Sequence, residues 1–225
     1  MFARGGRHWA VIAGAEFLVL TGVLAWVLWP AAVRAVPGTV QATVLSADEV
    51  GSALGVTLAS TTSSSEPPPP LVADSDACTA AVGPATTTVY GRGWNRFYSV
   101  THQDSEEVAE HVVTQVLGSY PEQGRAVAAF RELSEGVNGC DEAERTVVDD
   151  WSTDEITSNW FYDVYATTPD SLIWIAYQDG GDVWACYRQA RLKGRTLLQV
   201  AVCEAGDGAP ATAVVADRLA SRVGV

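Results

Sequence analysis

The sequence has few positively charged residues. It contains 14 Lys and Arg against 27 Asp and Glu, and Lys193 is its single lysine. Phosphate backbones are bound mainly by Lys and Arg, so a chain with a formal net charge of −13 is poorly suited to nucleic acid. The same acidity disfavours direct docking on anionic lipid. We therefore expect no nucleic-acid partner.

The chain also lacks the patterns of common catalytic and metal sites. Of its three histidines, His8 precedes a long apolar run, and His102 and His111 stand without metal-ligand spacing. No nucleophile-elbow motif is present, and the Gly91-Arg92-Gly93 stretch lacks the spacing of a phosphate loop. The abundant carboxylates are typical of a solvated face. We predict no catalytic residues, no metal, no cofactor and no enzymatic activity.

One long apolar run lies near the start of the chain. Residues 9–29 contain a single charge, Glu16, and are long enough to cross a hydrocarbon core of about 30 Å. Two arginines precede the run and favour an internal amino terminus. Residues 1–36 are therefore predicted to be a single-pass membrane anchor that leaves the carboxyl-terminal domain extracytoplasmic. A cleaved signal peptide with a site near residues 33–35 is the alternative that stays open.

Four cysteines are few, and two of them are spaced evenly around a glycine in WACYRQARLKGRTLLQVAVC, residues 184–203. A type II′ turn at Gly194-Arg195 places Lys193 opposite Thr196. Counting seven residues outward along each arm then sets Cys186 directly opposite Cys203. This is a non-hydrogen-bonded pair with Cα atoms about 4.5 Å apart, a separation that suits a disulfide. The alternative is two unpaired cysteines in a cytosolic sheet.

A disulfide requires an oxidising compartment, which agrees with export by the apolar run. With Cys186 and Cys203 paired, Cys78 and Cys140 remain to bond each other. The second bridge would join the start of the main domain to the end of its first long helix.

The exported part divides into two predicted regions. Residues 37–70 contain a short helix, 45–54, capped by Ser46, and a Ser/Thr/Pro-rich linker, SSSEPPPP, at 63–70. Residues 71–225 form the main domain.

The main domain is predicted to be α+β. Apolar residues at helical spacing predict helices at 121–138 and 210–223, whereas 110–120 fits a helix and a strand equally. β-rich runs predict strands at 86–90, 95–102, 146–151, 159–167, 171–178 and 183–192. Several strands in succession favour an antiparallel sheet with helices packed against it.

The order of these motifs is similar to that of a known protein family. An LSADEV helix, a Pro-rich linker, a cysteine before VYGRGW, a helix that ends in NGC and a final WACYR…VAVC hairpin occur in this order. From about residue 45 to 225 the chain resembles the PknH-like extracellular sensor domains of mycobacteria. Two departures accompany the resemblance: only eight residues precede the apolar run, which predicts that no kinase domain is attached, and the acylated cysteine of the lipoprotein members is absent.

The resemblance implies a compact domain with disulfides Cys78–Cys140 and Cys186–Cys203, and a cleft that binds an unidentified ligand. Indole rings supply rigid apolar area for such a site, and an arginine can pair with an anionic group. The ligand-binding candidates are Trp94, Trp160, Trp184 and Arg188. Each has a plainer alternative: the tryptophans as core residues, and the arginine as the partner of a nearby carboxylate.

Two functions remain open. The first is a membrane-anchored sensor domain that binds a small molecule, a lipid or a glycan. The second is an interaction or structural module that docks an envelope or membrane protein. The sequence favours the first only through the resemblance.

Overall fold

The computed structural model describes residues 40–91, 93–148, 155–180 and 184–224. Within them, nine strands form one antiparallel sheet in the order β1-β3-β4-β9-β8-β7-β6-β5-β2. The strands are β1 (Ser60–Ser64), β2 (Val72–Ala73), β3 (Arg96–Gln103), β4 (His111–Ser119), β5 (Glu142–Val148), β6 (Glu155–Thr167), β7 (Ser171–Gln178), β8 (Trp184–Lys193) and β9 (Thr196–Ala205).

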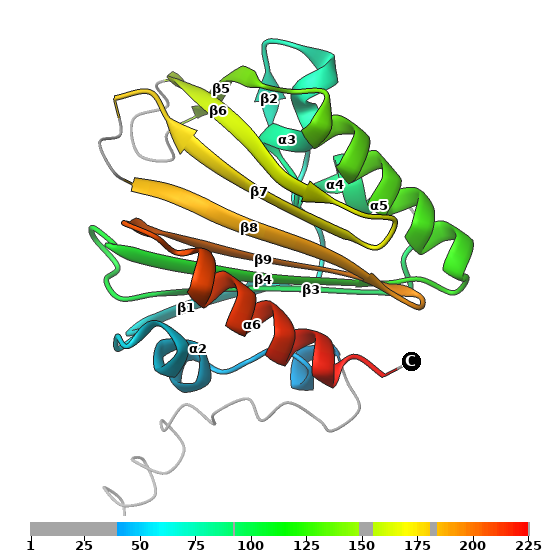
Figure 1. Cartoon of the computed structure of the whole chain (residues 1–225), viewed down its shortest axis with the longest axis horizontal. Helices are drawn as coiled ribbons and strands as arrows, with labels where there is room; N and C mark the ends of the chain where they lie inside the picture. Colours follow the sequence, from blue (N-terminus) through cyan, green and yellow to red (C-terminus); the bar gives the residue numbers. More distant parts are fainter. Residues whose placement is uncertain (1–39, 92, 149–154, 181–183, 225) are drawn as a thin grey trace, which may run out of the picture. The chain divides into compact units, whose positions relative to one another are not determined.

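Helices cover both faces of this sheet (Figure 1). They are the 3₁₀ helices η1 (Val40–Ala42) and η2 (Asp76–Cys78) and the α-helices α2 (Ala47–Leu54), α3 (Thr79–Val82), α4 (Thr87–Tyr90), α5 (Gln123–Asn138) and α6 (Ala209–Arg222). Side chains of α3, α4 and α5 pack into one core cluster, on what we call the α5 face of the sheet. Side chains of α2 and α6 pack into a second cluster, on the α6 face. The predicted α+β class, with helices against an antiparallel sheet, is confirmed.

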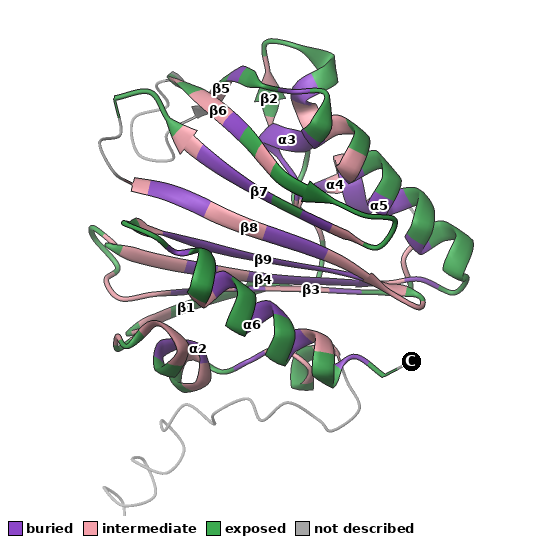
Figure 2. Ribbon diagram, in the orientation of Figure 1, coloured by how far each residue is buried: buried purple, intermediate pink, exposed green. Residues whose placement is uncertain are grey.

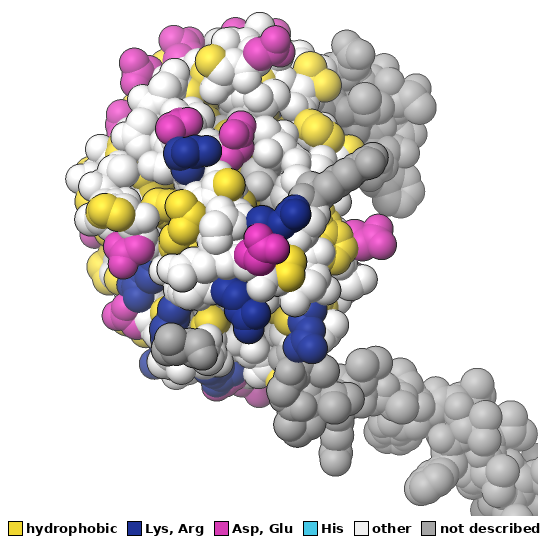
Figure 3. All heavy atoms as spheres, turned by 90° about the vertical axis from the view of Figure 1, so that its right-hand side faces the viewer, with side chains coloured by type: hydrophobic (Ala, Val, Ile, Leu, Met, Phe, Trp, Pro, Cys, Tyr) yellow, Lys and Arg dark blue, Asp and Glu magenta, His cyan; other side chains and the backbone are white. Residues whose placement is uncertain are grey.

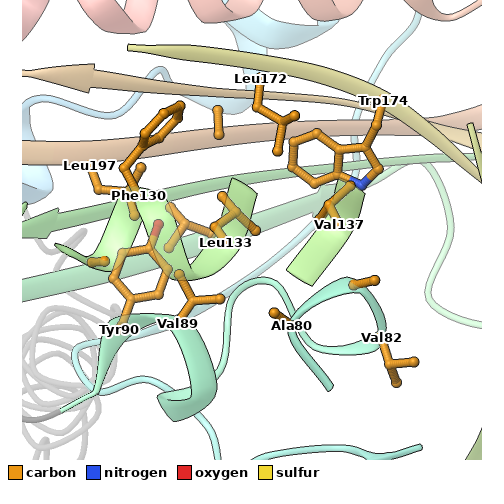
Figure 4. Close-up of a cluster of buried hydrophobic side chains, with 14 of the residues drawn as sticks. Ala80, Val82, Val89, Tyr90, Phe130, Leu133, Val137, Leu172, Trp174 and Leu197 are labelled. Carbon is orange, nitrogen blue, oxygen red and sulfur yellow. The ribbon is translucent and has the colours of Figure 1, made fainter. Parts of the chain in front are cut away.

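Both faces of the central strands are buried. In β9 the seven consecutive residues from Leu197 to Cys203 are buried, and Figure 2 shows the same continuous burial. A strand covered on both faces has no solvent side, so its buried residues are apolar on both faces instead of alternating, with Gln199 as the one polar exception. Leu197 projects into the α5-face cluster and Leu198 into the α6-face cluster. Figure 4 shows Leu197 close to Phe130 of α5, and Trp174 of β7 beside Val137.

The structure corrects one prediction of secondary structure. Residues 87–90 form the short helix α4, not a strand. Thr86 caps this helix, since its hydroxyl accepts a hydrogen bond from the Thr88 N–H, and Gly91 ends it at φ +41°. Val89 and Tyr90 are buried against the sheet, so tertiary packing outweighs their preference for strands.

Tertiary pairing also decides the ambiguous segment at 110–120. It forms β4, which pairs with β3 on one side and β9 on the other. The remaining predicted strands and both long helices are confirmed to within a few residues. Residues 149–151 and 183 of the predicted strands lie outside the described part.

The hairpin register is as predicted. Lys193 pairs with Thr196 around Gly194, whose φ is +57°, and Cys186 lies opposite Cys203. These two cysteines are bonded, with Cα atoms 3.9 Å apart, somewhat closer than the expected 4.5 Å. The second bridge, Cys78–Cys140, is also present.

Residues before residue 71 belong to the same core. α2 starts at the predicted cap Ser46, and Leu45 and Val50 are completely buried under α6. The serine and threonine part of the predicted linker forms the edge strand β1, paired with β3. The polyproline stretch therefore crosses the surface of the domain instead of separating two units.

Two buried polar side chains hold Leu45 in place. The Gln115 side chain accepts a hydrogen bond from the Leu45 N–H at 2.8 Å and donates one to the Leu45 carbonyl at 3.0 Å. His102 Nε2 donates to the same carbonyl at 3.1 Å, and Nδ1 accepts from the Thr61 hydroxyl at 2.9 Å. A carbonyl oxygen can only accept a hydrogen bond, so Nε2 must carry the proton. With Nδ1 as the acceptor from Thr61, the imidazole is a neutral ring with both nitrogens bonded. His102, which looked isolated in the sequence, is a structural residue.

The predicted membrane span at 9–29 lies outside the described residues. Among the helices that are described, none has the length and apolar character needed to cross a membrane. The anchor therefore stays a prediction.

We expect the two disulfides to contribute unequally to stability. They close loops of 62 and 17 residues, for which chain entropy gives about 4 and about 3 kcal/mol. Replacing Cys78 and Cys140 together by alanine should therefore lower the free energy of unfolding more than the same change at Cys186 and Cys203. Urea denaturation of both variants measures the difference. A larger loss at Cys186 and Cys203 would show that fixing the hairpin register outweighs loop closure.

His102 should make stability fall with acid. Burial lowers its pKa below the usual 6.5, and its bond to Leu45 only partly opposes this. The unfolded chain therefore takes up this proton at a higher pH than the folded one, so the stability that is full above pH 6.5 declines below it. Urea denaturation at about pH 7.5 and about pH 5.5 should show a smaller decline for His102→Gln than for the unmodified protein. Equal declines would contradict this. Carboxylates with lowered pKa values, such as Asp104 and Glu49, titrate below this window.

Candidate functional site

Strand register places Arg188 on the α5 face of the sheet. Residues directly opposite each other in an antiparallel pair point to the same face, and Arg188 lies opposite Trp174. Trp174 is buried in the α5-face cluster, where Figure 4 shows its indole beside Val137 and Leu172. Arg188 therefore extends over the same face, and so does Trp184, four residues earlier in β8.

The two strands beside β7 add side chains to this face. Trp160 and Tyr162 belong to β6; Tyr162 is buried in the α5-face cluster, and Trp160 packs against it. Arg145 lies two residues from the buried Ala143 of β5, so it points the same way. We call Arg145, Trp160, Tyr162, Trp184 and Arg188 the arginine–tryptophan face.

Its two arginines have buried nitrogens without partners. The Nε atoms of Arg145 and Arg188 are inaccessible to solvent and make no hydrogen bond, and no ion pair involving either arginine is found in the described part of the chain. The Nε1 of Trp174 is equally buried and unbonded. Leaving a buried donor unsatisfied costs about 1–3 kcal/mol, and more for a charged group. Within the described residues, no carboxylate partner of Arg188, the alternative considered from the sequence, is found.

Both guanidinium groups act on one tyrosine. Burial raises the pKa of Tyr162, and the positive charges of Arg188 and Arg145 partly oppose this rise. Burial lowers the pKa of Arg188 to about 10; Tyr162 opposes this change and Arg145 adds to it. The pKa of Arg145 is also lowered by burial. Both cations therefore act on Tyr162, each is desolvated, and neither is paired with a carboxylate among the described residues.

Trp160 and Trp184, unlike Trp174 and Tyr162, are only partly buried on this face. The Arg145 guanidinium carbon lies 5.8 Å from the centre of the Trp160 ring, a cation–π contact. The Trp160 Nε1–H donates to the Ser158 hydroxyl at 2.9 Å, which fixes the ring. Trp184 is half-buried at the start of β8. Three of the four candidate residues thus share the α5 face.

The fourth candidate, Trp94, lies elsewhere. It precedes β3, close to Phe97, with ring centres 6.1 Å apart. It lines a hollow of about 320 Å³ together with Glu66, Pro67 and Thr87. Register puts this end of β3 beside the hairpin tip, whereas Trp160 and Trp184 lie toward the opposite end of the sheet.

A larger cleft, of about 440 Å³, opens on the α6 face at the amino end of α6. Its walls include Tyr165, Ile173, Tyr187, Asp207 and Thr212. Tyr165 stands out from β6 because the register shifts between Val164 and Ala166, and 68% of it is exposed. Arg188, a ligand-binding candidate from the sequence, also lines this cleft. The exposed position of Tyr165 was not foreseen, because a β-bulge is recognised only from the pairing with the next strand.

Other basic side chains are bonded. Figure 3 shows Lys and Arg gathered at the end of the molecule that carries the hairpin tip and the ends of α5 and α6. Lys193 Nζ donates to the Ala220 carbonyl at 2.6 Å, and Arg195 donates to the Pro121 carbonyl at 3.2 Å. Arg191, on β8 like Arg188 but on the opposite face, pairs with Asp217 at 2.6 Å. Arg145 and Arg188 are set apart from these by their buried, unbonded Nε atoms.

Asp104, Glu110 and His111 form a second cluster of titratable groups, with potential ligand atoms within 4.8 Å of one another. His111 Nδ1 bonds to Asp104 Oδ2 at 2.8 Å, and Asp104 Oδ1 accepts from the main-chain N–H groups of Glu110 and His111. These bonds account for the cluster as a brace for the loop between β3 and β4.

Sequence reasoning missed Arg145 and Tyr162. Arg145 is separated from Arg188 by 43 positions, and the numbering alone does not reveal that their strands face the same side. The available signal was alternation within β5 and β6, but that assigns a face only once the neighbouring strands are known.

Replacing Arg188 by methionine should stabilise the unliganded domain. The change removes a desolvated charge and keeps most of the apolar stem, so we expect the free energy of unfolding to rise by about 1 kcal/mol or more. Denaturation in a buffer without phosphate or sulfate measures it. Arg191→Met is the matched control on the same strand: loss of its exposed pair should change stability by about 0.5 kcal/mol or less. Destabilisation by Arg188→Met would mean that the charge is satisfied in solution.

The chain is similar to a known protein family and to a solved structure. The family model described as the PknH-like extracellular domain matches residues 35–222. The crystal structure of the extracellular domain of PknH from Mycobacterium tuberculosis aligns with a TM-score of 0.68 and 19% sequence identity, and the alignment covers 81% of this chain and 93% of that one. No curated protein matches the sequence. The family match spans well over half of the chain, from before η1 to the end of α6, so the chain belongs to the family of PknH-like extracellular domains.

Proposed function

We propose that this protein is a non-catalytic sensor domain on the outer side of a membrane that binds its ligand on the arginine–tryptophan face. Family membership and the two disulfides support an extracytoplasmic location. A single-pass anchor at residues 9–29 would hold the domain at the membrane. No step in this function requires a catalytic group.

One observation carries the choice of site. The Nε atoms of Arg145 and Arg188 are buried without a hydrogen-bond partner in the described residues, neither arginine has an ion pair there, and Arg145 lies over the partly buried Trp160 ring. Structural arginines are normally satisfied, because an unpaired buried charge destabilises the fold. A ligand that supplies the missing acceptors would recover this free energy on binding.

The ligand would also contact aromatic surface. Trp160, which lies under Arg145, and Trp184, on the same face, both retain accessible area and can stack on an apolar or sugar ring. Small molecules, lipids and glycans all present such surfaces next to polar groups. The site therefore combines a flat apolar contact with fixed donors.

Native mass spectrometry of the full chain, purified in mild detergent from its own host, tests the proposal. The full chain is needed because α2 and β1, which lie before residue 71, belong to the core. We expect a mass excess that disappears on denaturation and is reduced in Trp160→Phe and Trp184→Phe. Trp94→Phe, at the other end of the sheet, should retain it. A bare mass for the unmodified protein would overturn the proposal.

Docking of an envelope or membrane protein is the second candidate function. The observation that favours it is the cleft on the α6 face, where Tyr165 and Ile173 expose apolar surface. Crosslinking in cells would then recover a stoichiometric partner, and Tyr165→Ser should abolish its recovery. A bare mass together with a Tyr165-dependent partner would establish this function instead of ligand binding.

A further inference from the structure

We infer that Arg145, Tyr162 and Arg188 form a binding site for an oxyanion, so that the ligand of this domain carries a phosphate, sulfate or carboxylate group. This inference rests on the proposed function and specifies the chemistry of its site. It follows from the hydrogen-bond donors that the fold brings together. It also follows from the lack of an acceptor beside them among the described residues.

The three residues offer donors only. A guanidinium presents five N–H groups and accepts no hydrogen bond, and a neutral phenol has one O–H to donate. Burial raises the pKa of Tyr162, so its hydroxyl stays protonated at neutral pH. The Nε atoms of both guanidinium groups are buried and make no hydrogen bond within the described residues. What the site lacks is an acceptor with several lone pairs.

Small side chains separate Tyr162 from Arg188 on this face. Register sets Tyr162 of β6 opposite Ala176 of β7, and Ala176 opposite Cys186 of β8. Ala176 and the Cys186–Cys203 bridge are buried in the α5-face cluster together with Tyr162. Arg188 follows two residues after Cys186 on the same face, so its long side chain starts within one residue pair of Tyr162 along the strands.

The second arginine approaches from the other side. Arg145 crosses the Trp160 ring, which is fixed by its bond to Ser158, and the cation–π contact directs the guanidinium toward Tyr162. Its Nε atom is buried, whereas the residue as a whole is only partly buried. A planar, delocalised cation held this way suits bidentate recognition of phosphate or carboxylate better than a lysine would.

The charge of the whole chain makes this pair unusual. With 27 acidic residues available, a structural arginine has many candidate partners, and Arg131, Arg191 and Arg222 each pair with one. Arg145 and Arg188 have none among the described residues, and the charge of Arg145 adds to the lowering of the Arg188 pKa by burial. A mobile anion satisfies both cations without a permanent carboxylate in the site.

Titrating the full chain in detergent with inorganic phosphate and with acetate tests the inference, with Trp fluorescence and thermal unfolding as readouts. We expect saturable binding that raises the melting temperature. Arg145→Gln and Arg188→Gln should each weaken it about tenfold or more, because each removes a charge-assisted hydrogen bond. Arg191→Gln, on the opposite face of β8, should bind as the unmodified protein does.

The source of the anion is decided by a second arm with vesicles of phosphatidylglycerol or phosphatidylcholine. Arginine-dependent binding to phosphatidylglycerol vesicles, with no response to free phosphate or acetate, would assign the oxyanion to a lipid headgroup. A saturable response to a free anion would assign it to a soluble ligand. Both support the oxyanion site.

Other outcomes would overturn it. The inference fails if no anion or anionic vesicle binds, if Arg145→Gln and Arg188→Gln bind normally, or if Arg191→Gln loses as much affinity as they do. Retention of the native mass excess by both arginine variants would leave the proposed function standing while removing the oxyanion. Absence of that excess in the unmodified protein would remove the function itself.

Discussion

The register of the β8–β9 hairpin is the constraint on which the rest of the structure depends. The two strands lie at the centre of the sheet, and both of their faces are covered, by α5 on one side and α6 on the other. A slip of one residue would exchange every side chain between the two cores. The bond between Cys186 and Cys203 fixes this register covalently. Each outer strand is then placed by pairing with its neighbour.

The same register positions the candidate site. It places Arg188 on the α5 face and Arg191 on the α6 face, where Asp217 neutralises the latter. Two arginines on one strand thus lie in different surroundings. Arg191 pairs with Asp217 of α6, whereas Arg188 lies on the other face of the sheet, where Tyr162 and a second arginine act on it. Stability alone would favour an apolar side chain at Arg188, and this is the physical basis of the binding role proposed for it.

The amino-terminal segment is integrated into the domain by polar contacts inside an apolar layer. Gln115 and His102 together satisfy both main-chain groups of Leu45, and α2 then packs under α6. Burial of these polar groups is tolerated because each is fully bonded. Any anchor that precedes residue 40 would therefore be connected to the central sheet through Leu45.

By itself, the sequence determined the α+β class, the hairpin register, both disulfides and the cap of α2. These features depend on local rules: side-chain period, turn geometry, cysteine spacing and capping. Tertiary structure alone decided that residues 87–90 form a helix, that 111–119 form a strand, that residues 60–64 add an edge strand, and that Arg145 and Tyr162 join Arg188. Each of these depends on which distant strands become neighbours. Burial on both faces of the sheet decides which strands become neighbours. The surroundings of a side chain are determined only by that pairing.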